Sequence, residues 1–203
     1  MIAIVDYGLG NLRSVKYALD RLGQPSMLTS AAAEILAARG VILPGVGAFS
    51  AAMANLRELG LVEVLRQVAG AGQPFMGICL GVQLLLSSSQ EHGRHEGLGI
   101  IPGQVVRFGH ELTVPQMGWN QVRQAAASPL FDGVPDGAWF YFAHSYYLKP
   151  ETPSADVGVT EYGHPYASVV QQGNVMGTQF HPEKSGPVGL RMLENFCGLC
   201  KKS

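Results

Sequence analysis

The sequence predicts a mixed α/β fold: a mostly parallel central sheet with helices on both faces and an antiparallel extension in the C-terminal half. Three observations lead to this prediction. Strand-like runs alternate with helix-like segments over residues 1–90, which is typical of a parallel sheet. After Gly97, strand-like runs follow one another with few helices between them. The 26 glycines lie mostly at the ends of apolar runs, where such a fold places its turns.

Length and composition favour a single domain over residues 1–203. A chain of this size can bury a sizeable core without disulfides or metals, and no linker-like stretch divides it. Charged residues make up 14% of the chain and the formal net charge is −1, which argues against a nucleic-acid scaffold and a disordered acidic chain. The start lacks a signal-peptide pattern, and no apolar run reaches the ~18 residues of a membrane span. We therefore expect a soluble, cytoplasmic protein.

The first predicted strand is Ile2–Val5, a β-branched run that ends at Asp6. A glycine-containing loop follows, and Asn11 is the expected N-cap of a helix. The apolar positions of that helix recur at intervals of three and four residues: Leu12, Val15, Leu19 and Leu22. Gly23 ends the helix, because glycine adopts the left-handed conformation common just after a helix.

The next predicted elements continue the alternation of strand and helix. Val41–Leu43 is a buried-strand candidate that runs into a Pro-Gly-Val-Gly loop. The segment Met53–Val68 has a helical pattern that is interrupted near Gly60. Pro74–Ile78 is a third strand, and Leu80–Leu86 is helical.

The C-terminal half is expected to add antiparallel strands to the sheet. A hairpin connection is predicted at residues 171–174, because Gly173 lies between two strand-like runs. Val188–Phe196 is an amphipathic closing helix. The predicted strands are Gln104–Phe108, Ala138–Tyr147, Val157–Glu161, Tyr166–Gln171 and Val175–Phe180.

A cysteine occupies the apex of a predicted strand-to-helix turn, in the pattern of a nucleophile elbow. Gly77 and Gly81 flank Cys79 at a distance of two residues on each side, where larger side chains would collide. The same turn places Cys79 at a helix N-terminus, where free N–H groups favour the thiolate. A small buried thiol at a tight turn is the structural alternative for this motif alone.

His181-Pro182-Glu183 is the second candidate motif. If this segment is extended, His181 and Glu183 project to the same side, and Pro182 stiffens the chain between them. A thiol nucleophile needs a proton acceptor such as imidazole, and the imidazole needs a carboxylate to orient it. A surface His–Glu pair is the alternative for the motif alone. The combination of this motif with Cys79 predicts a catalytic triad.

These motifs resemble those of the triad-type (class I) glutamine amidotransferases across nearly the whole chain. The resemblance rests on the Pro-Gly-Val-Gly loop at 44–47, the Gly-Ile-Cys-Leu-Gly-Val-Gln elbow at 77–83 and the Gln-Phe-His-Pro-Glu-Lys-Ser segment at 179–185. Within the family, further segments are similar to the glutaminase subunits that act in histidine biosynthesis with a (βα)8-barrel synthase (cyclase) partner. These segments are residues 6–12, 44–49, 117–120, 144–147 and 181–185.

The resemblance implies hydrolysis of the side-chain amide of L-glutamine through a thioester on Cys79. His181 would move the protons, and Glu183 would orient the imidazole. The N–H of Leu80, directly after the nucleophile, would be one oxyanion donor. By resemblance the second donor is the N–H of Val46, whose two glycine neighbours make a peptide flip sterically cheap. An ordinary strand-to-helix turn is the alternative for this loop.

The resemblance also implies a set of substrate-binding residues. Gln83 lies four residues after Cys79 and hence on the same helix face, although it would also suit a helix surface. Gly47 belongs to the oxyanion loop. Ser145, Tyr146 and Tyr147 would bind the α-amino and carboxylate groups of glutamine, largely through the backbone.

A partner interface is expected beside the site, formed by Asn11, Trp119 and Lys184. Trp119 would be an aromatic anchor, and Lys184 a cation that pairs with a partner carboxylate. We expect a one-to-one complex and predict no cofactor and no metal. Cys197 and Cys200 have metal-ligand spacing but lack a second ligand pair, and the C-terminus is expected to fray.

Other functions remain open on the sequence alone. The same triad would suit a glutaminase for another synthase, such as that of pyridoxal phosphate, or a stand-alone γ-glutamyl hydrolase. A non-catalytic interaction domain is a third possibility. The intact set of Cys79, His181 and Glu183 argues against the third. The lack of a further substrate or synthase domain in 203 residues argues against a glutaminase for another synthase and against a stand-alone hydrolase. The subunit-specific segments argue against both as well.

Overall fold

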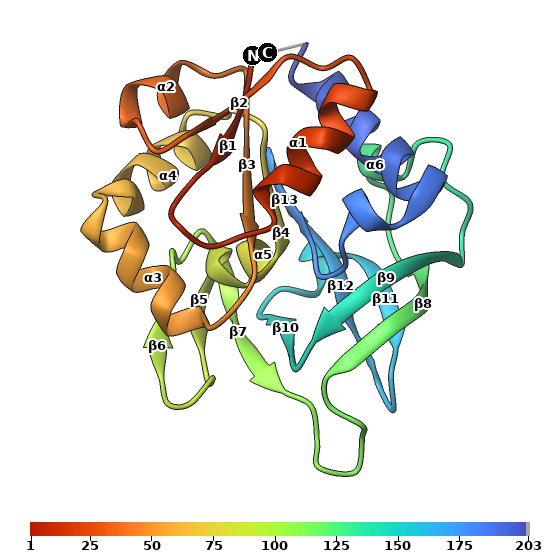
Figure 1. Ribbon diagram of the computed structural model, residues 1–203. Coiled ribbons are helices and arrows are strands. Elements are labelled where there is room, and N and C mark those ends of the chain that lie inside the picture. The colour runs from red at the N-terminus through yellow and green to blue at the C-terminus, as the bar shows by residue number, and fades with distance from the viewer. Residues whose placement is uncertain (202–203) are drawn as a thin grey trace.

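The computed structural model describes residues 1–201 and is built around a parallel sheet (Figure 1). Its five parallel strands lie in the order β2 (Ser26–Thr29), β1 (Ile2–Val5), β3 (Gly40–Gly45), β4 (Phe75–Cys79) and β13 (Val175–Thr178). The register aligns the carboxyl ends of β3, β4 and β13, with Gly45 opposite Cys79 and Thr178 opposite Ile78. The loops that leave these three strands therefore emerge at one edge.

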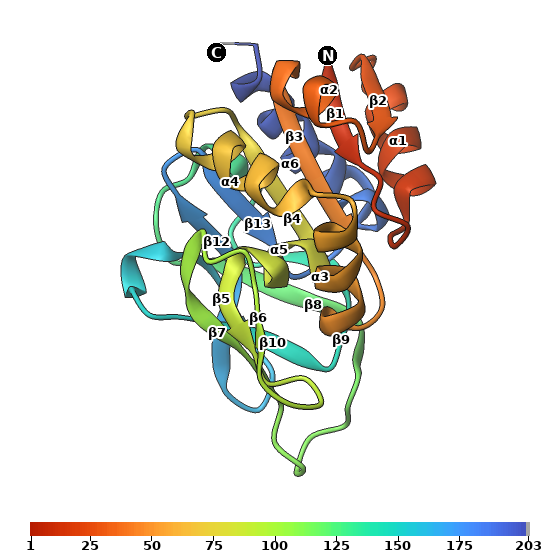
Figure 2. The same cartoon turned by 90° about the vertical axis from the view of Figure 1, so that its left-hand side faces the viewer.

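Helices cover both faces of this sheet (Figures 1 and 2). One face carries α1 (Leu12–Arg21) and α6 (Gly186–Leu199). The opposite face carries α2 (Ala32–Ala37), α3 (Phe49–Glu58), α4 (Leu61–Gly70) and α5 (Leu80–Leu85). None of the helices described in residues 1–201 is long and apolar enough to cross a membrane.

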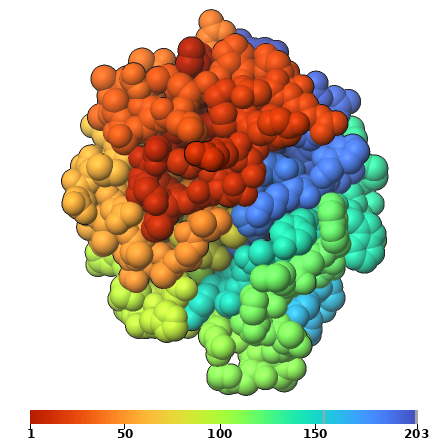
Figure 3. Space-filling model, in the orientation of Figure 1, coloured from red at the N-terminus to blue at the C-terminus, as the bar shows by residue number. Residues whose placement is uncertain are grey.

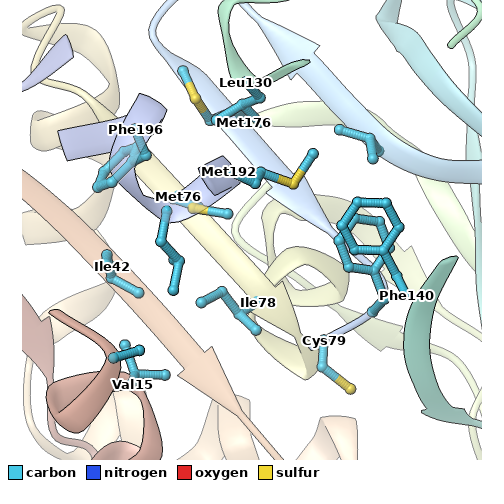
Figure 4. Close-up of a cluster of buried hydrophobic side chains, with 14 of the residues drawn as sticks. Val15, Ile42, Met76, Ile78, Cys79, Leu130, Phe140, Met176, Met192 and Phe196 are labelled. Atoms are coloured by element: carbon cyan, nitrogen blue, oxygen red, sulfur yellow. The ribbon is translucent and has the colours of Figure 1, made fainter. Parts of the chain in front are cut away.

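Strand alternation builds two hydrophobic cores, one on each side of the sheet. In β1, Ile2 and Ile4 pack toward α1 and α6, whereas Ala3 and Val5 pack toward the helices of the opposite face. Figure 4 shows the first core, with Cys79 at its edge. The nucleophile candidate therefore lies where the packed interior ends.

The C-terminal half extends the sheet beyond β13. The strand β12 (Pro165–Gln172) pairs antiparallel with β13, and the sheet branches at β12. One branch contains β10 (Tyr146–Pro150), β7 (Ile101–Arg107), β5 (Leu86–Ser89) and β6 (His95–Glu96). The other contains β11 (Asp156–Glu161), β8 (Gln116–Gln124) and β9 (Ala138–His144). The remaining elements are the 3-10 turns η1 (Pro129–Phe131), η2 (Pro153–Ala155) and η3 (Pro182–Lys184).

The predicted fold class is confirmed, and so are most N-terminal elements. The apolar stripe of α1 is buried at Val15 and Leu19, and Gly23 follows the helix with a φ of 65°. Gly60, at φ 67°, separates α3 from α4 at the predicted interruption. The hairpin between β12 and β13 pairs Gln172 with Val175, as its glycine predicted. In the space-filling view, the N-terminal segments (red and orange) cover the upper part of one face, and segments of the C-terminal half (green to blue) cover its lower part (Figure 3).

Several predictions about details were wrong. The run Ala138–Tyr147 is two strands, because the chain bends at Ser145 between β9 and β10. The extension is not wholly antiparallel, because β13 pairs parallel with β4 and β5 pairs parallel with β7. Asn11 precedes α1 but makes no side-chain capping hydrogen bond. The C-terminus was expected to fray, but Cys197 and Cys200 are both buried; the last two residues, 202–203, lie outside the described residues.

Candidate active site

The candidate site lies at a topological switch point of the sheet. The adjacent parallel strands β4 and β13 continue into helices on opposite faces, α5 after β4 and α6 after β13. In open α/β sheets, ligands bind in the crevice at the carboxyl ends of strands where the connections diverge in this way. Cys79 ends β4, and His181 follows β13 by three residues.

The turn at Cys79 is a strained elbow enforced by close packing. Cys79 has a φ of 54°, which is rare for a residue with a side chain. A Cβ added at Gly77 would lie 2.6 Å from Val82 Cα, inside the turn itself. A Cβ at Gly81 would lie 1.7 Å from the carbonyl oxygen of Leu43, on the neighbouring strand β3. The sequence spacing is therefore explained: both glycines are required to bring α5 against the sheet.

The base candidate and its carboxylate are paired, although not in the expected conformation. His181 Nδ1 lies 2.8 Å from Glu183 Oε1, and both side chains are almost completely buried. The segment is not extended as predicted: Pro182 begins the 3-10 turn η3, which folds Glu183 back toward the imidazole. A surface His–Glu pair is excluded by this burial.

The electrostatics of the site favour the imidazolium form of His181. Burial alone lowers the pKa of His181 because it disfavours the charged ring. Hydrogen bonds to Cys79 and Glu183, together with their negative charges, outweigh burial and raise the pKa to about 10. The site therefore favours a charged His181 ring that bonds to both Cys79 and Glu183.

A cavity of about 330 Å³ joins these groups. Cys79 and His181 both line it, and Glu183 stands behind His181. Its volume is at the lower end of the range typical of small-molecule sites. The lining residues are Val46, Gly47, Cys79, Leu80, Gln83, Glu91, Pro115, Met117, Ala143, His144, Ser145, Tyr146, His181 and Lys184.

Both predicted oxyanion residues line the cavity, Leu80 at the start of α5 and Val46 in the loop after β3. Leu80 begins α5, so its N–H has no partner within the helix. Val46 is 39% exposed, between two glycines in very different surroundings. At Gly45 a Cβ would lie 2.6 Å from the hydroxyl of Tyr7, whereas at Gly47, with φ 101°, it would meet nothing within 4 Å. The loop is fixed at its start and free at Gly47.

Gln83 lies in the cavity wall and holds a neighbouring segment in place. It is buried, which excludes the helix-surface alternative. Its Nε2 donates to the carbonyl of Tyr146 at 3.0 Å and to Oε1 of Gln179 at 3.1 Å. His144 Nδ1 donates to the same carbonyl at 2.7 Å. Two side chains thus fix the bend between β9 and β10, which contains Ser145.

Of the three consecutive predicted substrate residues, the cavity contains two. Ser145 and Tyr146 line it, whereas Tyr147 does not. The ring of Tyr147 instead stacks on Phe108, with ring centroids 4.8 Å apart, because alternation along β10 turns it to the other face of the sheet. A ligand in this cavity could therefore contact Tyr147 through its backbone but not through its ring.

Sequence reasoning assigned no role to five residues of the lining, and two of these, Glu91 and His144, have titratable side chains. His144 is buried, which lowers its pKa to about 4 and keeps the ring neutral near pH 7. Glu91 is the one carboxylate among the described residues that line the cavity, and its Oε2 accepts the N–H of Phe49 at 2.6 Å. No sequence motif indicated Glu91, because it lies in a loop and its contact, Phe49, is 42 residues earlier in the chain. The sequence could have indicated His144, because it directly precedes the predicted substrate residue Ser145.

Of the three residues predicted for an interface, Lys184 lines the cavity and Trp119 and Asn11 do not. Trp119 is 53% exposed on β8, and its ring packs edge-on against Tyr141 of β9. Lys184 is exposed, lines the cavity and places its Nζ 5.8 Å from the Tyr141 ring centroid. Asn11 is half-buried beside Gly10, which packs against Pro44 at the start of the oxyanion loop.

Cys197 in α6 and Cys200, which caps that helix, are free cysteines that do not line this cavity. Burial raises the pKa of Cys197 to about 12 and that of Cys200 to about 11, so both thiols stay protonated near pH 7. Within residues 1–201, no group of three or more His, Cys, Asp or Glu side chains is arranged to hold a metal ion.

Fold and site together define an α/β protein with a cysteine elbow and a paired histidine and glutamate at the carboxyl edge of its sheet. The family model for glutamine amidotransferase class-I matches residues 3–199. The chain therefore belongs to the class I glutamine amidotransferase family, whose members hydrolyse glutamine.

Comparison with curated proteins shows which members of the family this chain resembles. The chain is 55% identical to the imidazole glycerol phosphate synthase subunit HisH of Moorella thermoacetica, over 96% of this chain and 93% of the relative. It is 50% identical to the subunit HisH of Methanosarcina mazei, over 98% of both chains.

Solved structures support the fold. A crystal structure of a glutamine amidotransferase superimposes with a TM-score of 0.77 at 20% identity, covering 99% of this chain and 100% of the other. The structure of PurLQS from Thermotoga maritima gives a TM-score of 0.77 at 18% identity, with 97% of each chain covered.

Proposed function

We propose that this chain is the glutaminase subunit of an imidazole glycerol phosphate synthase in histidine biosynthesis. It hydrolyses L-glutamine to L-glutamate and ammonia, and the ammonia passes to a (βα)8-barrel synthase (cyclase) subunit in a heterodimer. The observation that carries the proposal is the meeting of Cys79 with the buried His181–Glu183 pair in one cavity, in a chain about half identical to HisH subunits. A cytoplasmic location and a single domain over residues 1–203 are part of the same proposal.

The first half-reaction forms a thioester. The Cys79 thiolate attacks the amide carbon of the glutamine side chain, and the carbonyl oxygen becomes an oxyanion. The C–N bond then breaks, and His181, charged as its raised pKa favours, gives its proton to the leaving ammonia. Glu183 holds the ring at Nδ1, so that the other nitrogen is the one that exchanges protons.

The second half-reaction uses the same groups in reverse. Neutral His181 takes a proton from water, and the hydroxide attacks the γ-glutamyl thioester. Cys79 leaves as the thiolate, and glutamate departs. In both halves the N–H groups of Leu80 and Val46 would stabilise the oxyanion, and losing one such donor typically costs about 10²–10³ in rate. The opening around Gly47 gives the Val46 peptide room to turn toward or away from the cavity.

Recognition of free glutamine requires partners for its charged α-groups. The backbone at Ser145 and Tyr146 lines the cavity, as does Gln83, and these remain the candidates from the sequence, with Gly47 beside them. Glu91 adds a carboxylate suited to an α-ammonium group. Tyr147 is retained in the proposal only through its backbone, because its ring packs elsewhere.

An exposed apolar stripe beside the cavity supports a docked partner. Met117 and Trp119 on β8 and Trp139 on β9 are 67%, 53% and 52% exposed, and Tyr141 lies between them. Exposed aromatic clusters of this kind commonly mark protein interfaces. The partner would cover this stripe, and Lys184 and Asn11 at the same edge of the sheet complete the proposed docking face.

The proposal is tested by measuring glutamine hydrolysis for the free chain, for its complex with the (βα)8-barrel subunit, and for the complex with the synthase substrate bound. We expect a nearly idle free chain and the fastest rate in the liganded complex. A ligand can shift the oxyanion loop only by its difference in affinity for the two loop states. A free chain as fast as the liganded complex would indicate a stand-alone hydrolase instead.

A further inference from the structure

Ser185 occupies the N-cap of α6 but does not cap the helix. Serine is favoured at this position because its Oγ accepts an N–H of the first turn, which stabilises a helix by about 1 kcal/mol. The Ser185 hydroxyl makes no such bond, and the second residue of the helix, Pro187, has no N–H to offer. Ser128, the N-cap of η1, does accept the N–H of Leu130 at 3.2 Å.

The Ser185 hydroxyl instead joins two backbone groups at the candidate base. It donates to the carbonyl of His181 at 2.6 Å and accepts the N–H of Tyr141 at 3.0 Å. Ser185 is 1% exposed, so these bonds form without competition from bulk water. The N–H of His181 donates directly to the carbonyl of Tyr141 at 2.9 Å. Both backbone groups of His181 are thus tied to Tyr141, one directly and one through the hydroxyl.

This tie comes where the sheet no longer fixes the chain. The strand β13 ends at Thr178, three residues before His181, and η3 then turns the chain toward α6. The bond to Glu183 orients the imidazole ring but comes from a residue in the same turn, so it cannot set where the turn sits. The link to Tyr141 on β9 places the turn relative to the rest of the site.

We propose that Ser185 is a positioning residue that sets the distance between His181 and Cys79, a role that rests on the proposed function of His181 as the base. A misplacement of about 1 Å can cost roughly 10² in rate. Loss of the hydroxyl should also weaken the Cys79 and Glu183 contacts that raise the pKa of His181. Substrate binding, made by other residues of the cavity, should be little changed.

The test compares Ser185→Ala, Ser185→Cys and Ser185→Thr in the complex with the synthase subunit. We expect Ala and Cys, which lack a strong hydrogen-bonding group, to lower glutaminase kcat by roughly ten- to a hundredfold with KM within about twofold. The alkaline limb of the kcat/KM profile should move to lower pH. Thr keeps the hydroxyl and should restore kcat to within about threefold. If Ala fails to fold, Cys carries the test, because its volume is close to that of serine.

Ser128→Ala is the matched control, because it removes a buried cap and a hydrogen bond to Gln171 outside the cavity lining. It should lower thermal stability with unchanged kcat. A wild-type kcat in folded Ser185→Ala or Ser185→Cys, or a Thr variant as slow as Ala, would overturn the positioning role. Failure of the proposed function is recognised separately: His181→Ala would then hydrolyse glutamine at the wild-type rate.

Discussion

Cys79 and His181 face one cavity, but the chain holds them in place by different means. On the Cys79 side, Gly77 and Gly81 leave no room for even one added carbon, so backbone packing fixes the elbow. On the His181 side, hydrogen bonds with Glu183, with Ser185 and with the backbone of β9 hold the base. Packing of this kind fails abruptly, whereas hydrogen bonds each contribute about 0.5–1.5 kcal/mol and fail gradually. Substitutions of the elbow glycines should therefore disrupt the fold abruptly, whereas substitutions on the His181 side should lower activity by degrees.

The largest effect is expected for Gly81→Ala. Its Cβ would lie 1.7 Å from the Leu43 carbonyl oxygen, so α5 must move off the sheet or the protein must unfold. We predict loss of soluble folded protein, and with it both the glutamine- and ammonia-dependent reactions of the complex, measured by circular dichroism and synthase rate. Gly70→Ala is the control, because its Cβ would meet nothing within 4 Å and helix α4 should gain stability. A stable, active Gly81→Ala protein would refute packing control of the elbow.

Cys79→Ala should remove the chemistry and leave the packing. The smaller side chain fits the same turn, so the protein should fold and bind its partner, but no thioester can form. We predict complete loss of ammonia release from glutamine, whereas added ammonia still supports the synthase reaction. Retained glutamine turnover would exclude the thioester mechanism.

Substitutions on the His181 side should give graded losses. His181→Ala removes the group that moves protons in both half-reactions, which is worth about 10²–10⁴ in rate. Glu183→Gln keeps an acceptor for Nδ1 but removes the negative charge, so its loss should be smaller. Single-turnover rates of both variants, with folding checked by circular dichroism, give the order. A slower Glu183→Gln enzyme would mean that the two roles are assigned wrongly.

Gly47→Val probes the one glycine of the oxyanion loop that has room around it. A Cβ at this position would meet nothing within 4 Å, so we expect the fold to survive, but φ 101° is strained for a β-branched residue. We expect weaker activation by partner and synthase substrate, with alkylation of Cys79 by iodoacetamide unchanged. Normal activation would show that this loop does not gate the site.

The smallest effect concerns stability against pH. The pKa of His181 rises from 6.5 to about 10 in the folded chain, so the protonated ring stabilises the fold. This contribution is full below pH 6.5 and is lost as the pH rises toward 10. Glu183→Gln should therefore flatten the fall in unfolding free energy between these values, measured by denaturant titration. An unchanged slope would show that Glu183 contributes little to the shift.

Local patterns were sufficient for most, but not all, of the N-terminal half of the fold. The stripe of α1, the interruption at Gly60 and the elbow glycines each act through their neighbours in sequence, so a single chain reveals them. The sequence did not reveal β8 or the edge strand β2, which have mixed polar and apolar residues. Their pairing is decided by distant strands, which a local pattern does not contain.

The candidate site divides in the same way. Cys79, His181 and Glu183 stand in short motifs, and the structure brings them together. Glu91 and Ser185 were missed as contributors because their contacts cross from one element to another. Tyr147 was included by resemblance, largely through its backbone, and strand alternation turns its ring away from the cavity.

The most direct test of a glutamine-accepting Cys79 is covalent labelling with a glutamine analogue that carries a diazoketone in place of the side-chain amide. Tryptic mass spectrometry identifies which of the three cysteines is alkylated, in the complex, with and without excess glutamine. We predict a label on Cys79 alone, blocked by glutamine and slowed by His181→Ala, with Cys197 and Cys200 untouched because their buried thiols stay protonated. A label on Cys197 or Cys200, or labelling of Cys79 that glutamine does not block, would contradict the proposed active site.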